Sequence, residues 1–303
     1  MQTKEDFDLI NILRCPNCKS ELTKDLECKK CSVKYPVIRG IPRFVNSEFY
    51  VENFGFQWNK HKRTQFDNEK EKPSENFLRQ IGLTPELVEG KLVLDAGCGA
   101  GRYSDVVSRW GAKVVGVDLS SAVEASYENL SSRGVKIIQA DIMNLPFAEE
   151  TFDVIFSIGV LHHTPNTRKA FEALIPFLKP GGFIVIWLYH AYNDDTTRMK
   201  LSKFYRRFSW KLPKKVLYGI SWMAVPYYYL NRVPILRVFT GRLWHIAEHK
   251  NWKWRVLDTF DWYSPKYQWH HTYPEVFQWF EENGLTNIRV SEPPVTVSGF
   301  KRK

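Results

Sequence analysis

The chain has 303 residues, a formal net charge of +10 and 44% hydrophobic residues. This length and composition allow a substantial core, which excludes a disordered protein and fits one large domain with appendages or two domains. The N-terminus is polar and acidic, so we expect no secretory signal there and a cytoplasmic location. The longest uncharged run, from Val216 to Asn231, is interrupted by Gly219 and Pro226 and is too short for a transmembrane span.

Residues 1–46 are predicted to form a zinc module. Cys15, Cys18, Cys28 and Cys31 make two CxxC pairs in a short, lysine-rich stretch. Four thiolates suit tetrahedral Zn²⁺, and a closed four-sulfur site is structural. We expect the nine residues between Cys18 and Cys28 to form a hairpin that brings the pairs together. A redox dithiol is the alternative, although a chain without a secretory signal favours a metal over disulfides.

The stretches RCPNCKSELTKDLECKKC and VKYPVIRGIPRF resemble known zinc ribbons. They are similar to the small activator subunits of tRNA and translation-factor methyltransferases, and to the zinc-binding N-termini of some rRNA guanine methyltransferases. The resemblance covers about residues 10 to 45. Similar ribbons stand at the N-terminus of methyltransferases of other substrate classes, so the resemblance implies an enzyme class more than a substrate.

Short strand patterns alternate with helical patterns over residues 91–190, after a segment, 47–90, that is predicted to be a helical linker and cofactor cap. The strand candidates are KLVLDAG, AKVVGVD, VKIIQAD, FDVIFSIG and GFIVIWLY. The helical patterns are RYSDVVSRWG, SSAVEASYENLSSRG and TRKAFEALIPFLKPGG. This alternation predicts right-handed βαβ units, a mostly parallel sheet covered on both faces, and ligands at the carboxyl ends of the strands.

The first of these strands runs into a glycine loop from Asp95 to Gly101 that reads D-x-G-x-G-x-G. A dinucleotide loop would need GxGxxG to hold a pyrophosphate, and the spacing here differs. The acid before the glycines suits a cationic group, such as the amino group of a methionine moiety. Asp118 ends the second strand, where a carboxylate can accept both hydroxyl groups of a ribose.

These motifs, in this order, resemble those of class I S-adenosylmethionine methyltransferases. The resemblance implies a Rossmann-like, seven-stranded, mostly parallel sheet with an antiparallel C-terminal hairpin formed by TNIRVSE and PVTVSGF. It also implies that Asp141 holds the adenine amino group, with the Ile142 amide nearby, and that Cys98 fills space in the loop. The implied cofactor-binding set is Asp95, Ala96, Gly97, Cys98, Gly99, Gly101, Asp118, Leu119, Asp141, Ile142 and Ser157. A plain α/β domain that binds no nucleotide is the alternative.

Two sequence clusters contain the candidate catalytic groups. His162 and His163 follow the fourth strand, beside the expected methyl position, and either could act as a general base or simply shape the loop. The cluster DTFDWYSPKYQWHHTYPEVF is expected to be a loop that enters the last helix and reaches the acceptor pocket, with Asp261 as its catalytic candidate. An aromatic corner without function is the alternative for this cluster. The candidate substrate contacts are Trp58, Tyr263, His270 and His271.

Residues 191–257 are predicted to be a basic, aromatic, helical insert that serves as a substrate lid, and residues 258–303 complete the core. From Arg198 to Arg255 the chain has fourteen Lys or Arg residues, thirteen aromatic residues and one acid, Glu248. Such a surface can bind RNA, lie on an anionic membrane, or pack as a simple lid. Binding of RNA and peripheral membrane contact through residues 198–255 both stay open at this point.

The sequence therefore predicts an S-adenosylmethionine-dependent methyltransferase that carries a structural Zn²⁺ and methylates an oxygen or nitrogen of a small-molecule, saccharide or lipid-linked acceptor. Methylation of tRNA or rRNA is the second hypothesis. The chain has SIGVLHHT where an Asn-Pro-Pro-Tyr motif would stand, which disfavours methylation of an exocyclic base amine. A cofactor-binding scaffold without catalysis is the third hypothesis, and the complete cofactor motif disfavours it.

Overall fold

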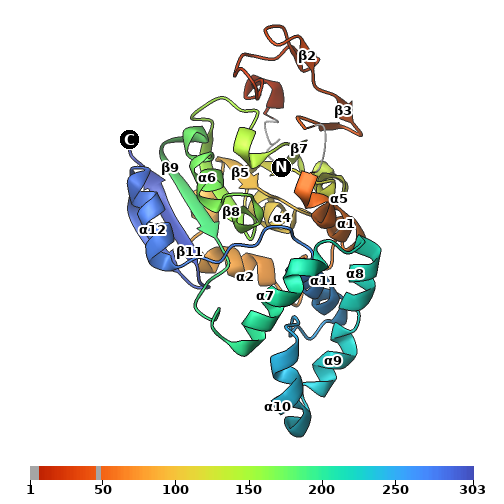
Figure 1. Ribbon diagram of the computed structural model, residues 1–303. Helices are drawn as coiled ribbons and strands as arrows, with labels where there is room; N and C mark the ends of the chain where they lie inside the picture. Colours follow the sequence, from red (N-terminus) through yellow and green to blue (C-terminus); the bar gives the residue numbers. More distant parts are fainter. Residues whose placement is uncertain (1–6, 46–48) are drawn as a thin grey trace.

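The computed structural model describes residues 7–45 and 49–303, and its centre is one seven-stranded sheet (Figure 1). The strand order is β10-β11-β9-β8-β5-β6-β7. All neighbouring strands from β9 to β7 are parallel, and β11 is antiparallel to both of its neighbours. The predicted fold class is therefore confirmed. The strands are β5 (Leu92–Ala96), β6 (Lys113–Asp118), β7 (Lys136–Gln139), β8 (Phe152–Ile158), β9 (Leu178–Trp187), β10 (Leu285–Ser291) and β11 (Thr296–Lys301).

The sheet has a separate apolar core on each face because successive side chains of a strand point to opposite sides. Val93 and the strand residues on the same face of the sheet pack against helices α2 (Pro73–Gln80), α3 (Pro85–Val88), α4 (Arg102–Arg109) and α5 (Ala122–Leu130). Leu94 and the strand residues on the opposite face pack against α6 (Thr167–Glu172) and α12 (Tyr273–Glu282). Short 3₁₀ turns complete the connections: Leu9–Asn11, Phe49–Val51, Ser131–Arg133, Ile142–Asn144, Leu161–His163 and Ile175–Phe177.

The N-terminal ribbon packs directly on the sheet. The connection from β7 to β8 contains no α-helix, and the ribbon covers this part of the sheet with Leu13, Cys15 and Phe44. Backbone hydrogen bonds fix the contact, since Arg14 N donates to Pro146 O over 2.9 Å and Phe44 N donates to Gln139 O over 2.8 Å. The ribbon therefore shares a core with the larger domain. The predicted boundary between residues 46 and 47 lies outside the described residues.

The ribbon differs from the prediction in the position of its hairpin. The strands β1 (Glu27–Cys28) and β2 (Val33–Lys34) pair across the second CxxC turn, and β3 (Val37–Ile38) pairs with β4 (Ile41–Pro42). The predicted hairpin between Cys18 and Cys28 is wrong as a pair of strands: Arg14 forms an isolated bridge with Glu21, and Thr23 N donates to Glu27 O over 3.0 Å to close a turn. Each tight turn brings the two thiols of its own pair together, and the two pairs meet with Cys15 and Cys31 at 3.9 Å and Cys18 and Cys28 at 3.5 Å.

One helix is also shorter than its sequence pattern. The predicted helical stretch TRKAFEALIPFLKPGG forms α6 only to Glu172, and β9 begins at Leu178, within the same stretch. Pro176 disfavours a continued helix because it lacks the N–H and restricts the residue before it.

The segment between β9 and the last helix is helical, as expected. It contains α7 (Thr197–Ser209), α8 (Lys214–Ser221), α9 (Ala224–Leu230) and α10 (Pro234–Leu243), and α11 (Trp252–Tyr263) follows. The helix α11 packs on α8, α9 and α1 (Glu52–Lys60). In Figure 1 the insert and the ribbon lie at opposite ends of the molecule. Among the described helices, we find none that is long and apolar enough to cross a membrane.

Two predicted boundaries change at α11. The expected loop around Asp261 and Tyr263 is instead the last turn of this helix, and the predicted division between residues 257 and 258 falls inside it. Asn251 caps the helix by accepting hydrogen bonds from the amides of Lys253 and Trp254. Asp258 and Asp261 are three residues apart and therefore lie on one face, one turn from each other.

Candidate functional site

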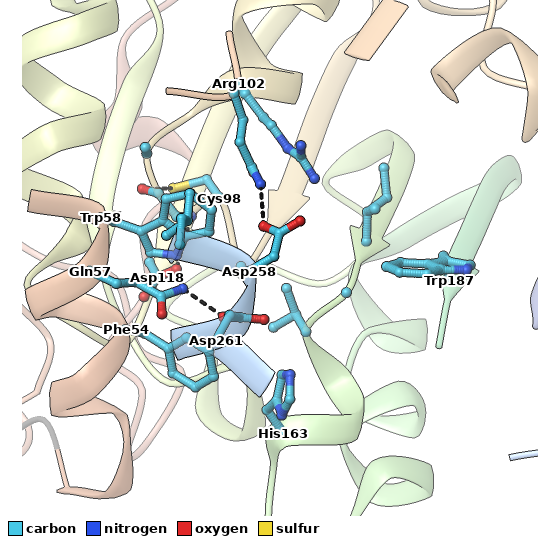
Figure 2. A pocket seen from close by; sticks show the side chains of 18 of the residues that line it. Phe54, Gln57, Trp58, Cys98, Arg102, Asp118, His163, Trp187, Asp258 and Asp261 are labelled. Atoms are coloured by element: carbon cyan, nitrogen blue, oxygen red, sulfur yellow. Dashed lines mark hydrogen bonds between the residues drawn. The ribbon is translucent and has the colours of Figure 1, made fainter. Parts of the chain in front are cut away.

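A cavity of about 630 Å³ lies at the carboxyl ends of β5, β6 and β8. Its walls come from the glycine loop, from α1 and from α11 (Figure 2). This is the place where ligands bind in open parallel sheets, because the loops that follow the strands diverge there. The predicted site residues that line it are Trp58, Gly97, Cys98, Gly99, Asp118, Leu119, Asp141, Ile142, His163, Asp261 and His270.

The glycine loop brings backbone rather than side chain to the cavity. Gly97 has a φ of +97°, and a Cβ there would lie 2.4 Å from the Val160 side chain. Gly99 has a φ of +53°, and a Cβ there would lie 3.1 Å from the Trp58 indole nitrogen. Larger residues would be strained at both positions. The close approach of Trp58 shows that α1 lies against the loop, as a cofactor cap would.

Three hydrogen bonds hold the Asp118 carboxylate in place at the cavity. One of its carboxylate oxygens accepts hydrogen bonds from the Ser120 amide and hydroxyl over 2.8 and 2.7 Å, and the other accepts from the Gly99 amide over 2.9 Å. Burial raises the pKa of Asp118, while these hydrogen bonds lower it. Two carboxylate oxygens have about four lone-pair sites, so about one site remains for a ribose hydroxyl group. Asp141 caps the next turn by accepting from the Met143 amide over 2.9 Å.

Four members of the predicted cofactor set lie beneath the cavity surface. Asp95 accepts a hydrogen bond from the Ser104 hydroxyl over 2.6 Å, and burial raises its pKa to about 7. The Ser157 hydroxyl donates to Ala96 O over 2.7 Å, and Gly101 begins α4 with a φ of +89°. These residues shape the loop from below. None of the four, Asp95, Ala96, Gly101 and Ser157, lines the cavity.

The two adjacent histidines differ in their access to the cavity. His162 is fully buried, and its Nδ1 faces the Tyr189 amide at 3.4 Å, so it does not reach the cavity. His163 lines the cavity and donates from Nδ1 to Tyr267 O over 2.9 Å. Its Nε2 therefore has a free lone pair, and this buried atom has no hydrogen-bond partner. Burial lowers the pKa of His163 to about 3, so the ring is neutral near pH 7.

Two carboxylic acids of α11 line the same cavity, and each is bound to a glutamine. Gln65 Nε2 donates to Asp258 Oδ1 over 2.7 Å, and Gln57 Nε2 donates to Asp261 Oδ1 over 2.6 Å. The second oxygen of Asp258 accepts from Trp254 Nε1 over 2.9 Å, and that of Asp261 lies 3.3 Å from the Tyr189 hydroxyl. Burial raises both pKa values, that of Asp258 to about 7.

Two of the expected substrate contacts point elsewhere. The Tyr263 hydroxyl donates to His245 O over 3.0 Å, and its ring packs in the core beneath α8 and α11. His271 is buried beside Thr167 and Glu275, at 3.0 Å from each. His270 does reach the cavity, and its Nδ1 lies 2.6 Å from Asp194 Oδ1.

Several cavity residues escaped the sequence analysis. The main ones are Gln65, Arg102, Trp187, Tyr189, Trp254, Asp258 and Trp262. Asp258 had a usable signal, because it stands three residues before Asp261 and a helix would place both on one face. Gln65 and Tyr189 had no such signal in the sequence, because only the three-dimensional course of the chain brings them to the cavity.

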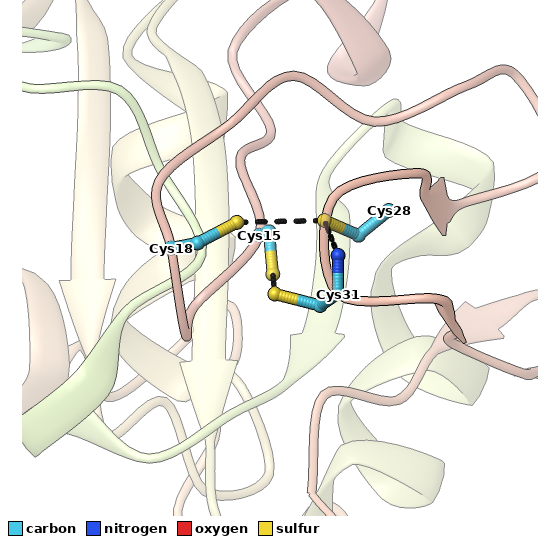
Figure 3. Close-up of side chains that lie close together, drawn as sticks. All are labelled: Cys15, Cys18, Cys28 and Cys31. Carbon is cyan, nitrogen blue, oxygen red and sulfur yellow. Dashed lines mark hydrogen bonds between the residues drawn. The ribbon is translucent and has the colours of Figure 1, made fainter.

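The four cysteines of the ribbon form the second site (Figure 3). Their sulfur atoms lie within 4.8 Å of one another, with Cys15 and Cys31 at 3.9 Å and Cys18 and Cys28 at 3.5 Å. Zinc–thiolate bonds of about 2.3 Å in a tetrahedron place sulfur atoms at such separations. The donor set therefore fits a closed, structural Zn²⁺ site, with no open position for catalysis.

Comparison with known proteins agrees with this geometry. Residues 94–186 match the family described as a methyltransferase domain, and residues 6–40 match the family described as Trm112p-like protein. Residues 94–186 are therefore a class I, S-adenosylmethionine-dependent methyltransferase domain. In particular, it is one preceded in the same chain by a Trm112-like zinc ribbon, and its cofactors are S-adenosylmethionine and structural zinc.

Relatives of the chain have different substrates in their names. The chain is 40% identical over 114 residues to a tRNA (carboxymethyluridine(34)-5-O)-methyltransferase of Arabidopsis thaliana, covering 37% of this chain and 27% of the relative. It is 31% identical over 156 residues to a sterol 4-C-methyltransferase of Caenorhabditis elegans, covering 50% and 45%. It is 33% identical over 130 residues to a phosphoethanolamine N-methyltransferase of Caenorhabditis elegans, covering 41% and 30%. The chain thus spans less than half the length of these relatives.

Proposed function

We propose that this protein transfers a methyl group from S-adenosylmethionine to an oxygen or nitrogen of a small-molecule or lipid-linked acceptor. The observation that carries this proposal is a single cavity lined both by the glycine loop with Asp118 and by the polar groups His163 and Asp261. The first pair suits the cofactor, and the second suits an acceptor that must lose a proton. Aromatic side chains complete the walls, which is common in pockets for small molecules.

The pKa values of the cavity residues indicate which of them can accept a proton from the acceptor. S-adenosylmethionine, when bound, supplies an electrophilic methyl group, so the protein mainly aligns an acceptor. His163, with a pKa near 3, is a weak base, but its Nε2 can accept a hydrogen bond from the acceptor and orient it. Asp258, with a pKa of about 7, and Asp261, with a raised pKa, are better matched to take a proton near neutral pH.

The test uses labelled S-adenosylmethionine and the purified protein with extract separated into RNA, lipid and small-molecule fractions. We expect label in the lipid or small-molecule fraction, loss of labelling with Asp118→Ala, and strong reduction with Asp261→Asn. No label in any fraction from a protein that binds S-adenosylhomocysteine would favour the scaffold hypothesis.

The surface of the insert supports a lipid-linked acceptor. Ile235 is 76% exposed, Met223 61% and Val238 60%, although all three are strongly apolar. Exposed apolar side chains that are concentrated in one segment can mark an interaction surface. Further exposed apolar side chains of the segment are Phe204, Phe208, Val216, Ile220, Trp222, Tyr229, Leu230, Val233, Leu236, Leu243 and Trp252.

The charges of the insert favour an anionic lipid surface as the occupant of this patch. Lys214, Lys215, Arg232, Arg237 and Arg242 belong to the same segment and are exposed. A second copy of the chain would set these like charges against each other. RNA contacts use phosphates and base stacking, and aliphatic side chains contribute little to them. Apolar side chains with a basic surround, by contrast, match the interface of an anionic bilayer.

A vesicle-binding experiment tests this surface. We expect the protein to float with vesicles of phosphatidylglycerol and phosphatidylcholine, and less with phosphatidylcholine alone. The variant Ile235→Ser/Val238→Ser should lose this binding, whereas the control Val290→Ser, an exposed valine on β10, should keep it. Equal binding by these two variants, or none by the wild type, would contradict the proposal.

Methylation of tRNA is the second candidate function. The observations that favour it are the Trm112p-like ribbon and the 40% identity to a tRNA methyltransferase over 114 residues. Label in tRNA that disappears with Asp118→Ala, with no label in lipid, would establish this function and exclude the lipid-linked acceptor.

A further inference from the structure

The acidic pair of α11 lacks a cationic partner. All four hydrogen bonds to Asp258 and Asp261 come from neutral groups, the two glutamine amides, an indole and a phenol. Arg102 lines the same cavity and its charge lowers the pKa of both acids, yet among the described residues no ion pair within 4.0 Å involves either acid. Two adjacent carboxylates in a partly buried site are costly unless a cation joins them.

Five buried atoms without hydrogen-bond partners belong to residues that line the cavity: Gln57 Oε1, Gln65 Oε1, His163 Nε2, His190 Nδ1 and His245 Nδ1. The first three are hydrogen-bond acceptors. Gln57 and Gln65 donate their amide hydrogens to the acids, and their Oε1 atoms have no partner. His163 donates from Nδ1 to Tyr267 O, and its Nε2 has no partner. All three side chains are more than nine-tenths buried. A ligand that satisfies them must therefore donate several hydrogen bonds.

The aromatic wall of the cavity suits a cation as well. Tyr189 and Trp262 are stacked, with ring centroids 5.4 Å apart, and Tyr189 also contacts the acid of Asp261. Trp254 donates to Asp258 and lines the cavity. Aromatic faces next to carboxylates attract alkylammonium groups, because the ring quadrupole and the negative charges act in the same direction.

We propose that the acceptor carries a protonated amino group that binds between Asp258 and Asp261. An ammonium group brings one positive charge and up to three hydrogens, enough for the two acids and one of the unpartnered acceptors. This inference rests on the proposed function, because it concerns the acceptor side of the same cavity. It assigns the acids to the acceptor rather than to the methionine amino group of the cofactor, since both stand on α11 and not on the glycine loop.

Burial and the neighbouring acid support the same assignment through pH. Desolvation is the main cause of the raised pKa of Asp258, and the charge of Asp261 adds to it. A bound ammonium would favour the ionised form of both acids. The affinity for an amine should therefore rise as the pH increases from 6 to 8, while most alkylamines remain protonated.

The experiment compares 2-phenylethylamine with 2-phenylethanol, two probes that differ only in the amino and hydroxyl groups. Calorimetric titrations use the full chain saturated with S-adenosylhomocysteine. We expect the amine to bind at least about tenfold more tightly than the alcohol, and Asp261→Asn and Asp258→Asn to remove this preference. Glu248→Gln, which neutralises an acid elsewhere in the insert, should leave it unchanged.

The affinity for S-adenosylhomocysteine distinguishes the possible failures. A wild type that does not bind S-adenosylhomocysteine contradicts the proposed function itself. A wild type that binds it but shows no preference for the amine overturns only the present inference. If Asp258→Asn and Asp261→Asn weaken S-adenosylhomocysteine as much as the amine, the acids serve the cofactor and the inference is wrong.

Discussion

Gln57 donates a hydrogen bond to Asp261 over 2.6 Å, although the two residues are 204 positions apart in the chain. The contact joins α1, which precedes the sheet, to α11, which follows the insert. Gln65 and Asp258 repeat it over 2.7 Å. Two glutamine–aspartate pairs thus connect α1 and the segment that follows it to α11.

The first prediction concerns the coupling of Gln57 with Asp261. A double-mutant cycle with Gln57→Ala and Asp261→Ala should show a coupling of about 1–3 kcal/mol in the free energy of unfolding, because a charged acceptor strengthens the hydrogen bond. Urea denaturation measures it. Additive effects of the two substitutions would show that the contact contributes nothing to stability.

The second prediction concerns the cofactor. Asp118→Ala should weaken S-adenosylhomocysteine binding by about tenfold or more, since the ribose hydroxyl groups lose a charged acceptor. Calorimetric titration gives the dissociation constants. Asp25→Ala, at an exposed position in the ribbon, is the control and should bind like the wild type. Unchanged affinity in Asp118→Ala would place the ribose elsewhere.

The third prediction concerns the metal. The purified protein should contain one zinc per chain, and Cys28→Ser should lower both the zinc content and the melting temperature, by roughly 5 °C or more. The ribbon shares a core with the sheet, so its loosening destabilises the large domain. Cys98→Ser is the matched control, because Cys98 lies in the glycine loop, and its zinc content should not change. A zinc-free wild type with paired, oxidised thiols would contradict the site.

The fourth prediction concerns the pH dependence of stability. His163 has a folded pKa of about 3, below its ordinary value of 6.5, so only the unfolded chain takes up the proton between these values. Its contribution is complete above pH 6.5 and is lost as the pH falls toward 3. Between pH 6.5 and 4.5 the loss should be about 2 kcal/mol.

His163→Asn should therefore lose less stability on acidification than the wild type. Urea denaturation at pH 6.5 and 4.5 measures the difference. Asp258 acts in the opposite direction, because its raised pKa gives stability that is lost as the pH rises through about 7. Asp258→Asn should flatten that second change. Equal slopes in His163→Asn and the wild type would show that the ring takes up its proton as readily in the folded chain as in the unfolded chain.

The sequence alone was sufficient for the features that depend on local spacing. The two CxxC turns, the loop from Asp95 to Gly101 and the strand-end acids Asp118 and Asp141 are set by residues close together in the chain. The order of strands and helices predicts the parallel sheet, because right-handed connections leave few topologies. Pro176 is a local signal that the helical pattern hid, and it explains the early end of α6.

Only the tertiary structure decided which side chains meet in the cavity. His162 and His163 are neighbours, yet His162 lies in the core and His163 faces the cavity. Both belong to the 3₁₀ turn Leu161–His163, in which successive side chains point in different directions. Asp258 is held by Gln65, which is 193 positions away in the chain, and Asp261 is held by Gln57, which is 204 positions away. Local sequence patterns predict the backbone conformation of a segment and which of its faces is buried. The convergence of distant elements depends on how the whole chain packs, and the cavity wall that contains Asp258 and Asp261 is formed by that packing.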